Sequence, residues 1–386
     1  MTMQKICIIG GGLTGLITAA VLSKQNVNID LVVGNNKQKS ESNRTTAISN
    51  DNYDYLKKLD FQKNFWSSKK MELYEKLSNN KIEKIFELQK KNENILHMVE
   101  NFKLTKKLTE FLKRKKTITF KKKNISNNMI TSGVINEVKF QNNKANKYNL
   151  IIVCTGKNSK LIKQIFKDDK IDHNYEELSF TTILKHSFNE NNVARQIFLN
   201  DGIIAFLPIS NFKTSIVWSK KNSFSHKLKK EKFSSPKKQM SMYAKNFYKN
   251  IKFISKIESN SLNLLIRNSF YKNRILLFGD ALHSVHPLAG QGFNMILRDL
   301  ENLENKIKNK INLGMDIGNI DVLSEFSNEI KPRNFLYSVG IDIIKKGFSI
   351  QNETYKKIRN NIVSNLNNKF FAKEILFNLA NNKLKL

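Results

Sequence analysis

Short apolar runs separated by a glycine turn open the chain. Lys5–Ile9 predicts a buried strand, Gly10–Gly15 a tight turn, Leu16–Lys24 a helix and Ile29–Val33 a second strand. A strand, a helix and a further strand in this order form a βαβ unit, in which the two strands are parallel. The pattern therefore predicts an α/β domain built on a parallel sheet.

Two more helices and a further buried strand are predicted downstream. A helix is expected at about residues 50–59, and Leu104, Leu108 and Leu112 recur at helical spacing within residues 102–114. Leu150–Cys154 is a continuous apolar run, which is typical of a strand buried on both faces. These elements extend the parallel domain.

Between residues 179 and 219 the pattern changes to alternation. β-branched and aromatic residues dominate Ile197–Leu199, Ile203–Leu207 and Ser215–Trp218. A period of two is typical of antiparallel strands with one face packed on a core. We therefore expect an antiparallel sheet inserted between two parts of the parallel domain.

Three residues of this region are candidates for a substrate pocket. Phe206, Leu207 and Pro208 either wall an apolar pocket or belong to the sheet core, and the pattern leaves both open. Trp218 is expected in the core. The polar, lysine-rich stretch Lys220–Lys238 that follows is the best candidate for a mobile loop.

The end of the chain predicts a strand and then helices. Arg274–Phe278 is apolar again, and about the last 60 residues have helical patterning. Phe335, Val339, Ile343 and Ile344 share one helical face, with two lysines alongside. Such a stripe either faces a membrane surface or, more commonly, packs against the rest of the protein.

Length and composition bound the possibilities. The chain has 386 residues, of which 40% are hydrophobic, so we expect two or three domains of roughly 100–200 residues with a sizeable core. No apolar run approaches the roughly 20 residues that span a bilayer, and Met1–Ile9 enters a strand directly, so neither a transmembrane helix nor a signal peptide is expected. Cys7 and Cys154 lie in apolar runs and are expected to be buried, reduced thiols.

A net charge of +33 raises the question of a nucleic-acid partner. Lysines are spread along the whole chain, and aromatic residues are not interleaved with them in a stacking pattern. A solvated lysine surface explains the charge, so no nucleic acid is expected. Contact with an anionic membrane surface is favoured over nucleic acid, because acidic lipids attract polybasic surfaces.

The turn after the first strand fits the dinucleotide pattern G-x-G-x-x-G. Gly10 permits the tight turn, Gly12 lets the backbone approach a pyrophosphate, and Gly15 lets helix and strand pack closely. The phosphates would lie at the positive end of the helix that follows, near Leu13 and Thr14.

One part of the dinucleotide pattern is missing. About 20 residues on, an Asp or Glu at the end of the second strand usually holds the adenosine ribose hydroxyls. The chain has Gly34 there, followed by Asn35, whose amide could hydrogen-bond a ribose without charge.

A second candidate segment follows the strand that ends at Phe278. Gly279 and Asp280 leave that strand, and a glycine-rich stretch, residues 290–294, enters a helix. A carboxylate at a strand end holds sugar-type hydroxyls, and a glycine-rich helix entry offers free N–H groups to a polarised ring carbonyl. This segment and the first glycine turn would hold the two ends of one extended cofactor.

Residues 279–294 resemble the signature G-D-A-x-H-x-x-x-P-x-x-G-Q-G-x-N of class A flavoprotein monooxygenases, and more narrowly that of the ring hydroxylases of ubiquinone biosynthesis. Residues 44–49, 195–198, 202–208 and 215–218 resemble the same family in the same order. The resemblance implies a discontinuous, Rossmann-like FAD-binding domain with an inserted antiparallel β substrate domain and a helical C-terminal tail. The implied boundaries are 1–66, 99–170 and 265–325 for the FAD-binding domain, 67–98 and 171–264 for the substrate domain, and 326–386 for the tail.

The resemblance also implies roles for single residues. Arg44 would lie beside the phosphate or ribityl portion of FAD, Asp280 would bind the ribityl chain, and Pro287 with the backbone of residues 290–294 would line the isoalloxazine ring. The implied cofactor contacts are Gly10, Gly12, Leu13, Thr14, Gly15, Arg44, Gly279, Asp280, Pro287, Gly290, Gln291, Gly292, Phe293 and Asn294.

The activity implied by the resemblance is FAD-dependent hydroxylation of the aromatic ring of a polyprenylated phenol. O2 would be the co-substrate, and NADPH, NADH or another donor the reductant. The flavin carries such chemistry, so no catalytic side chain is required. A prenylated substrate implies a cytoplasmic protein in peripheral contact with the inner face of the cytoplasmic membrane, or a member of a biosynthetic complex.

Two departures keep alternatives open. The family has an Asp-Gly pair after the strand that corresponds to residues 150–154, where this chain has Thr155 and Gly156; with Gly34, two acidic positions are lost. The alternatives are a FAD-dependent oxidoreductase for another aromatic or lipid substrate, a catalytically weakened flavoprotein scaffold, and a charge-driven binder of anionic membranes or nucleic acid.

Two histidines in the second segment invite a metal site. His283 and His286 are three residues apart, but no nearby Cys or paired carboxylate completes a tetrahedral ligand set. We therefore expect no metal, and for His283 a structural role at least as much as one in tuning a flavin.

Overall fold

The parallel domain is built on a six-stranded sheet. The computed structural model describes residues 3–34, 42–61, 64–77, 81–122, 125–131, 136–140, 145–166, 170–221, 235–350 and 352–368; Asn35 and most of the predicted loop Lys220–Lys238 lie outside them. All neighbouring strands pair in parallel except the antiparallel edge pair. The strands follow the order β19 (Tyr271–Lys272), β20 (Ile275–Leu277), β12 (Leu150–Val153), β1 (Gln4–Ile9), β2 (Val27–Val32) and β8 (Ile118–Lys121).

Helices cover this sheet and bury its apolar runs. Leu104, Leu108 and Leu112 are fully buried on one face of α3, as their spacing predicts. Cys7 and Cys154 are free and buried. The helices of this domain are α1 (Leu13–Leu22), α2 (Asn50–Lys57), α3 (Asn101–Lys113), α4 (Lys160–Ile165) and α7 (Gln291–Asn312).

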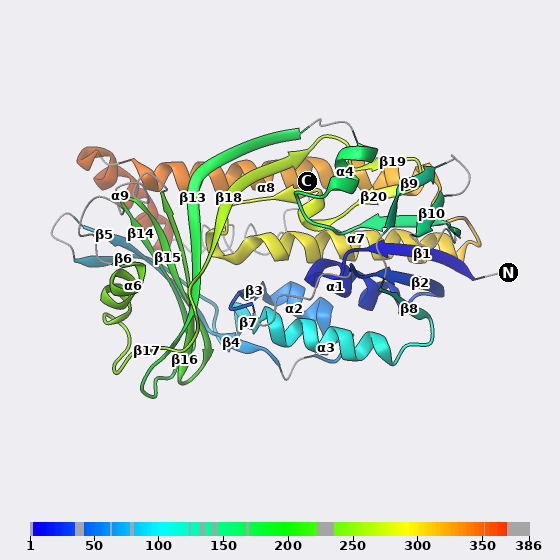
Figure 1. Ribbon diagram of the computed structural model, residues 1–386. Coiled ribbons are helices and arrows are strands. Elements are labelled where there is room, and N and C mark those ends of the chain that lie inside the picture. The colour runs from blue at the N-terminus through cyan, green and yellow to red at the C-terminus, as the bar shows by residue number, and fades with distance from the viewer. Residues whose placement is uncertain are drawn as a thin grey trace.

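A large sheet, antiparallel but for one strand pair, forms the second layer of the molecule, with long, curved strands beside the parallel domain (Figure 1). Its one parallel pair joins β14 to β5, so residues 70–89 enter the sheet from a distant part of the chain. The order is β21 (His283–Ser284), β18 (Glu258–Arg267), β13 (Lys170–Lys185), β16 (Lys213–Lys221), β15 (Gly202–Ser210), β14 (Val193–Leu199), β5 (Lys70–Lys76) and β6 (Ile82–Gln89), with β17 (Lys252–Phe253) on β13.

The two faces of the antiparallel sheet have different environments. Trp218 is buried, as predicted, and packs with Phe206 and residues of α6 (Pro236–Ala244) on one face. Leu207 and Val217 belong to a separate apolar cluster on the opposite face, because neighbouring residues of a strand alternate between faces. The predicted α/β fold with an inserted antiparallel sheet is confirmed.

Two small antiparallel sheets of three strands each accompany the two large sheets. One of them contains β3, which contacts α2, and it lies at the boundary between the two large sheets. Their orders are β3 (Thr45–Ser49), β7 (Leu96–Glu100) and β4 (Trp66–Ser68), and β11 (Ala145–Tyr148), β10 (Asn136–Phe140) and β9 (Ile125–Thr131).

Long helices end the described chain. Helix α8 (Ile320–Ser349) runs beside α7 from the parallel domain to the antiparallel sheet, where α9 (Glu353–Asn368) packs on β6 (Figure 1). The apolar stripe on α8 is not packed against the rest of the protein, which is the more common arrangement: Phe335 is 44% exposed and Ile343 is 64% exposed. No helix in the described ranges is long and apolar enough to cross a membrane.

Candidate functional site

A cavity of about 1800 Å³ lies between the two large sheets. It begins at the carboxyl ends of β1, β2, β12 and β8, where ligands of open parallel sheets bind. The volume exceeds the roughly 300–1,000 Å³ of ordinary small-molecule sites and suits an extended ligand. The predicted residues Gly10, Gly12, Leu13, Thr14, Arg44, Asp280, Pro287, Gly290, Gly292 and Phe293 all line it.

The first glycine turn is shaped by close backbone contacts. Gly10 has φ +132°, and a Cβ there would come 2.4 Å from the Cys154 carbonyl oxygen. A Cβ on Gly15 would come 1.9 Å from the Gly10 carbonyl oxygen, so Gly15 packs inside the turn rather than lining the cavity. Around Gly12, by contrast, the position of a Cβ is open. The N-terminus of α1 has no side-chain cap and faces this open space, as an anion site requires.

Asp280 is the one acidic residue among the described residues that line the cavity. It follows β20, and its carboxylate is accessible from the cavity but surrounded by protein. No hydrogen bond or ion pair joins this carboxylate to another described residue. Desolvation raises the pKa of Asp280, while His283, Arg44 and Lys157 oppose that rise. A carboxylate held in this way is available to accept hydrogen bonds from ligand hydroxyls.

A second helix N-terminus meets the cavity at its other end. Helix α7 begins after Gly290, which has φ +69° and contributes no side-chain cap. A Cβ on Gly290 would lie 3.1 Å from that of Ala47, so β3 packs directly on the turn. We call the part of the cavity around Pro287 and Gly290 the ring end, and the part around Gly34 the adenosine end.

Asn294 and Gln291 support the ring end from behind. Asn294 is fully buried; its amide donates to the Ala47 carbonyl at 2.9 Å, and its oxygen accepts from the Ser49 N–H at 2.9 Å. Gln291 accepts a 2.5 Å hydrogen bond from the Tyr337 hydroxyl of α8. Neither lines the cavity, and Gly279 packs on Thr14, so these three predicted contacts shape the site from outside it.

His283 is part of a buried polar network between α7 and α8. Its Nε2 lies 2.9 Å from Asp299 Oδ2, and the Asn334 amide donates to the same oxygen at 2.8 Å. All three residues are at least 97% buried. Hydrogen bonds between buried side chains fix their positions. His283 is therefore an oriented structural histidine.

His286 is held by a second buried network, which sequence reasoning missed. Its Nε2 lies 2.9 Å from Glu177 Oε2, and Lys345 of α8 forms an ion pair with Glu177 Oε1 at 2.9 Å. Burial lowers the pKa of His286 against the opposing effect of Glu177. Burial also raises the pKa of Glu177, but its contacts with His286 and Lys345 outweigh this and lower it overall. No signal in the sequence links these three positions.

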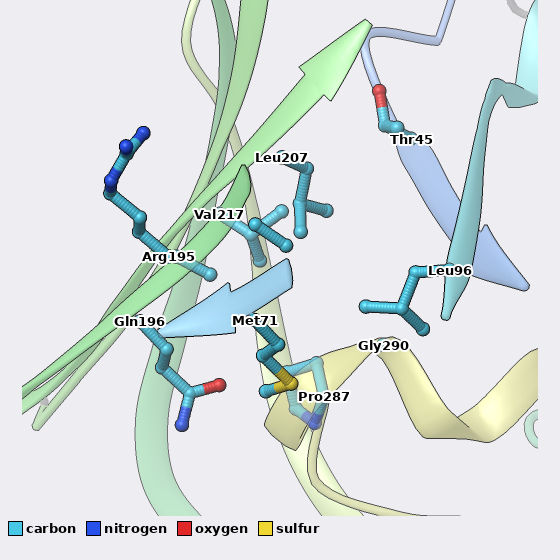
Figure 2. A pocket seen from close by; sticks show the side chains of 11 residues that line it. Thr45, Met71, Leu96, Arg195, Gln196, Leu207, Val217, Pro287 and Gly290 are labelled. Atoms are coloured by element: carbon cyan, nitrogen blue, oxygen red, sulfur yellow. The ribbon is translucent and has the colours of Figure 1, made fainter. Parts of the chain in front are cut away.

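A smaller apolar pocket adjoins the ring end. Its volume is about 80 Å³, and Figure 2 shows Leu207, Val217 and Met71 of the antiparallel sheet facing Pro287. The Arg195 side chain points away from these residues and pairs with Glu72 at 3.0 Å. Thr45, Val217, Pro287 and Gly290 line both the pocket and the large cavity.

The three predicted pocket residues are divided between the two faces of the sheet. Leu207 lines the apolar pocket. Phe206 is fully buried on the opposite face, with Phe247 and Tyr248, so the core alternative describes it. Pro208 is buried and does not line either cavity.

The residues of the large cavity fit FAD at the diphosphate and at the ring end. Two uncapped helix N-termini, the open position at Gly12 and the unpartnered Asp280 carboxylate match a diphosphate, a ring carbonyl and ribityl hydroxyls. The hydroxyl oxygens of Thr45 and Thr181, both on the cavity, are buried without a hydrogen-bond partner. Among the described residues no carboxylate lines the adenosine end, where the second strand ends at Gly34.

The described residues offer no metal site, because no three His, Cys, Asp or Glu side chains among them gather closely enough to hold an ion.

The chain belongs to the family of FAD-binding domains, whose model matches residues 3–315. The match covers both glycine segments and the antiparallel sheet between them.

Two known proteins similar to this chain have names that refer to ubiquinone or ubiquinol. The human mitochondrial ubiquinone biosynthesis monooxygenase COQ6 is 29% identical over 234 residues, which cover 52% of this chain and 50% of that one. The 3-demethoxyubiquinol 3-hydroxylase of Escherichia coli K12 is 28% identical over 156 residues, 40% of this chain and 39% of that one. This chain thus spans half or less of either relative.

The fold is that of solved flavin monooxygenases. The p-nitrophenol 4-monooxygenase PnpA of Pseudomonas putida DLL-E4 superposes with a TM-score of 0.78 over 98% of both chains, at 13% sequence identity. At this identity the comparison shows the shared fold, and it covers the C-terminal helices as well as the FAD-binding domain.

Proposed function

We propose that the protein is a FAD-dependent monooxygenase that hydroxylates the aromatic ring of a polyprenylated phenol in ubiquinone biosynthesis. The observation that carries this proposal is the junction of the apolar pocket with the ring end, through the four residues that line both. A ring in that pocket would lie beside the flavin ring. The names of the similar proteins supply the substrate class.

The chain's own part is to orient, bind and exclude water. Bound FAD supplies the oxygen chemistry, by which one atom of O2 enters the substrate ring. Asp280 would hold the ribityl hydroxyls, and the N-terminus of α7 would face the ring carbonyls. Met71, Leu96, Leu207 and Val217 give the substrate side an apolar wall, which keeps water from the reacting atoms.

The pocket must widen to admit an aromatic ring. Its volume of about 80 Å³ is below the roughly 150 Å³ of a cavity that holds benzene. Met71 is its most flexible wall residue, since methionine has three rotatable bonds and adapts its shape. The prenyl chain would then extend away from the pocket.

A prenylated substrate requires contact with a membrane surface. Phe335, Leu336, Val339, Ile343 and Ile344 on α8 are each 36–64% exposed. Exposed apolar residues on a chain of net charge +33 suit the headgroup region of an anionic bilayer. We propose peripheral docking through this face, with NADPH or NADH as the source of electrons.

The test is turnover by the purified, FAD-loaded protein. We expect a short-chain prenylated phenol, a nicotinamide reductant and O2 to yield a product with one oxygen atom derived from O2, as isotope-labelled O2 and mass spectrometry would show. Leu207→Trp should block turnover yet retain bound flavin, whereas Ile171→Trp, at a site that is 44% exposed and lines neither the pocket nor the large cavity, should turn over normally. Peroxide release without hydroxylation of any prenylated phenol would contradict the proposal.

A further inference from the structure

The adenosine end of the cavity is formed by two neighbouring strands and one helix. Strand β8 pairs in parallel with β2, and the Val33 N–H donates to the Lys121 carbonyl at 3.0 Å. Gly34 and Lys122 therefore leave the same edge of the sheet side by side. Lys113, the last residue of α3, lines the cavity with them.

The charges at this end are unbalanced. The basic residues that line the cavity in the described ranges are Arg44, Lys113, Lys122 and Lys157, whereas the acidic one, Asp280, lies after β20, on the far side of β12 and β1 from Gly34. No ion pair joins Lys113 or Lys122 to a described carboxylate.

The acidic residues of β2 and α3, Asp30 and Glu110, are engaged elsewhere. Asp30 is buried within β2, where it accepts a hydrogen bond from Tyr148 at 2.7 Å and pairs with Lys5 at 3.0 Å. Glu110 lies 3.8 Å from Lys107 on the exposed side of α3. Among the described residues, Lys113 and Lys122 are thus the charged groups that line the cavity beside Gly34, and they give this end a positive field.

Carboxylates and lysines select different ribose groups. A carboxylate accepts hydrogen bonds from the free ribose diol and repels a phosphate, whereas a cation at the end of the second strand binds a ribose phosphate. Gly34 removes the repulsion and leaves room, since glycine has no side chain. Lys113 and Lys122 supply the cations.

We propose that the adenosine end binds an additional phosphate carried by the adenosine ribose. The ligand class is an adenosine 5′-diphosphate with a ribose phosphate, as in the phosphorylated nicotinamide dinucleotides. The inference rests on the proposed function for the direction in which the dinucleotide lies, but not on the hydroxylation. It follows that such a ligand competes with the adenosine half of FAD for this cavity.

The experiment measures displacement of FAD from the full-length protein. Two matched probes differ by one phosphate: ADP-ribose, and ADP-ribose phosphorylated at the adenosine 2′ position. We expect the phosphorylated probe to bind about tenfold to hundredfold more tightly, because hydrogen bonds to charged groups are the strong ones, with a preference that declines as salt rises. A third probe, phosphorylated at the 3′ position, shows which hydroxyl the lysines favour.

Variants distinguish binding at this site from nonspecific attraction to the positively charged surface. The double variant Lys113→Gln/Lys122→Gln should lose the preference, and so should Gly34→Glu, which restores a carboxylate and should strengthen FAD binding. Lys116→Gln is the matched control, because Lys116 is exposed just beyond α3 and does not line the cavity.

The outcomes distinguish two failures. Equal binding of the two matched probes, or a preference that survives in the double variant, would overturn the inference while leaving FAD binding intact. Failure of FAD itself to bind would contradict the proposed function together with this inference.

Discussion

The ring end and the adenosine end of the cavity are built in different ways. The ring end is supported by side chains from α7, α8 and β13, among them the buried pairs His283–Asp299 and His286–Glu177. The adenosine end has a glycine turn, backbone N–H groups and exposed lysines. Buried hydrogen-bond networks fix geometry, while exposed charges act through their field. The ring end is thus organised for position and the adenosine end for charge.

The difference matters because the two ends have different tasks. A reacting ring must be held within a fraction of an ångström of its partner, whereas the adenosine half only anchors the cofactor. Helix α8 contributes Asn334, Tyr337 and Lys345 to the ring end, and it lies beyond residue 315, where the match to the FAD-binding family ends. Helix α8 therefore supports the site from outside the cavity.

The largest effect is expected at the first glycine turn. Gly15→Ala would place a Cβ 1.9 Å from the Gly10 carbonyl oxygen, so the turn and the start of α1 must shift. We expect loss of FAD binding and a lower melting temperature in calorimetry. Gly12→Ala is the matched control: its Cβ meets no atom within 4 Å, so it should weaken FAD binding without changing the melting temperature. Equal thermal stability of both variants would refute this contrast.

Breaking the network around His286 should destabilise the ring end. Lys345→Met leaves Glu177 with one partner in a buried site, at an expected cost of about 3 kcal/mol in the free energy of unfolding. Lys346→Met, next along the helix, removes an ion pair of a side chain that is 75% exposed and should change stability by no more than about 0.5 kcal/mol.

The Lys345→Met variant should also change the titration of His286. Burial is the main cause that lowers the pKa of His286, and Lys345 lowers it further, so removal of Lys345 should shift the pH titration profile of the His286 ring, followed by NMR, toward higher pH. A purely structural role would lower stability and leave this profile in place.

Lowering the pH should destabilise the protein through protonation of His97. Burial lowers the pKa of His97 from 6.5 to about 4, where it stacks on Tyr53 and lies 3.0 Å from Asn50 Oδ1. The unfolded chain takes up a proton on His97 at a higher pH than the folded chain does. The stability that neutral His97 contributes is therefore fully present above pH 6.5 and is lost as the pH falls toward 4. The loss is at most about 3 kcal/mol.

Urea unfolding of the protein and of His97→Gln between these pH values measures this contribution. The pKa values of His186 and His286 are also lowered by burial, but both residues remain in the variant, so the difference between the two curves isolates His97. Parallel curves would show that His97 does not titrate in this window.

The smallest of these effects is expected at Asp280. Its carboxylate has no hydrogen-bond partner in the described chain, so Asp280→Ala should leave the melting temperature unchanged. FAD affinity should fall about tenfold to hundredfold, as for the loss of hydrogen bonds to a charged group. Isothermal titration measures it, with Asp280→Asn as the variant that keeps shape; unchanged affinity in both would remove Asp280 from the site.

Local features of the fold were predictable from the sequence. The glycine turn, the strands around it and the inward face of α3 each depend on residues close together in the chain, so spacing alone indicates them. The second segment also depends on residues close together in the chain, and Asp280, Pro287 and Gly290 all line the cavity.

Contacts between distant residues were not predictable in the same way. Glu177 and His286 are 109 positions apart, and no periodicity links them. Alternation shows that Phe206 and Leu207 face opposite sides of the sheet, but not which side has the pocket. Similarly, the spacing on α8 predicts an apolar stripe but not that it is exposed. The role of Lys122 depends on β8 lying beside β2, which only the fold shows.

The most direct test is the visible spectrum of the purified full-length protein, recorded before and after addition of FAD. We expect a yellow protein, or a colourless one that takes up one FAD per chain, with the flavin bands shifted by the apolar ring end. A colourless protein that cannot be loaded with FAD would contradict the assignment of the cavity and, with it, the proposed hydroxylase.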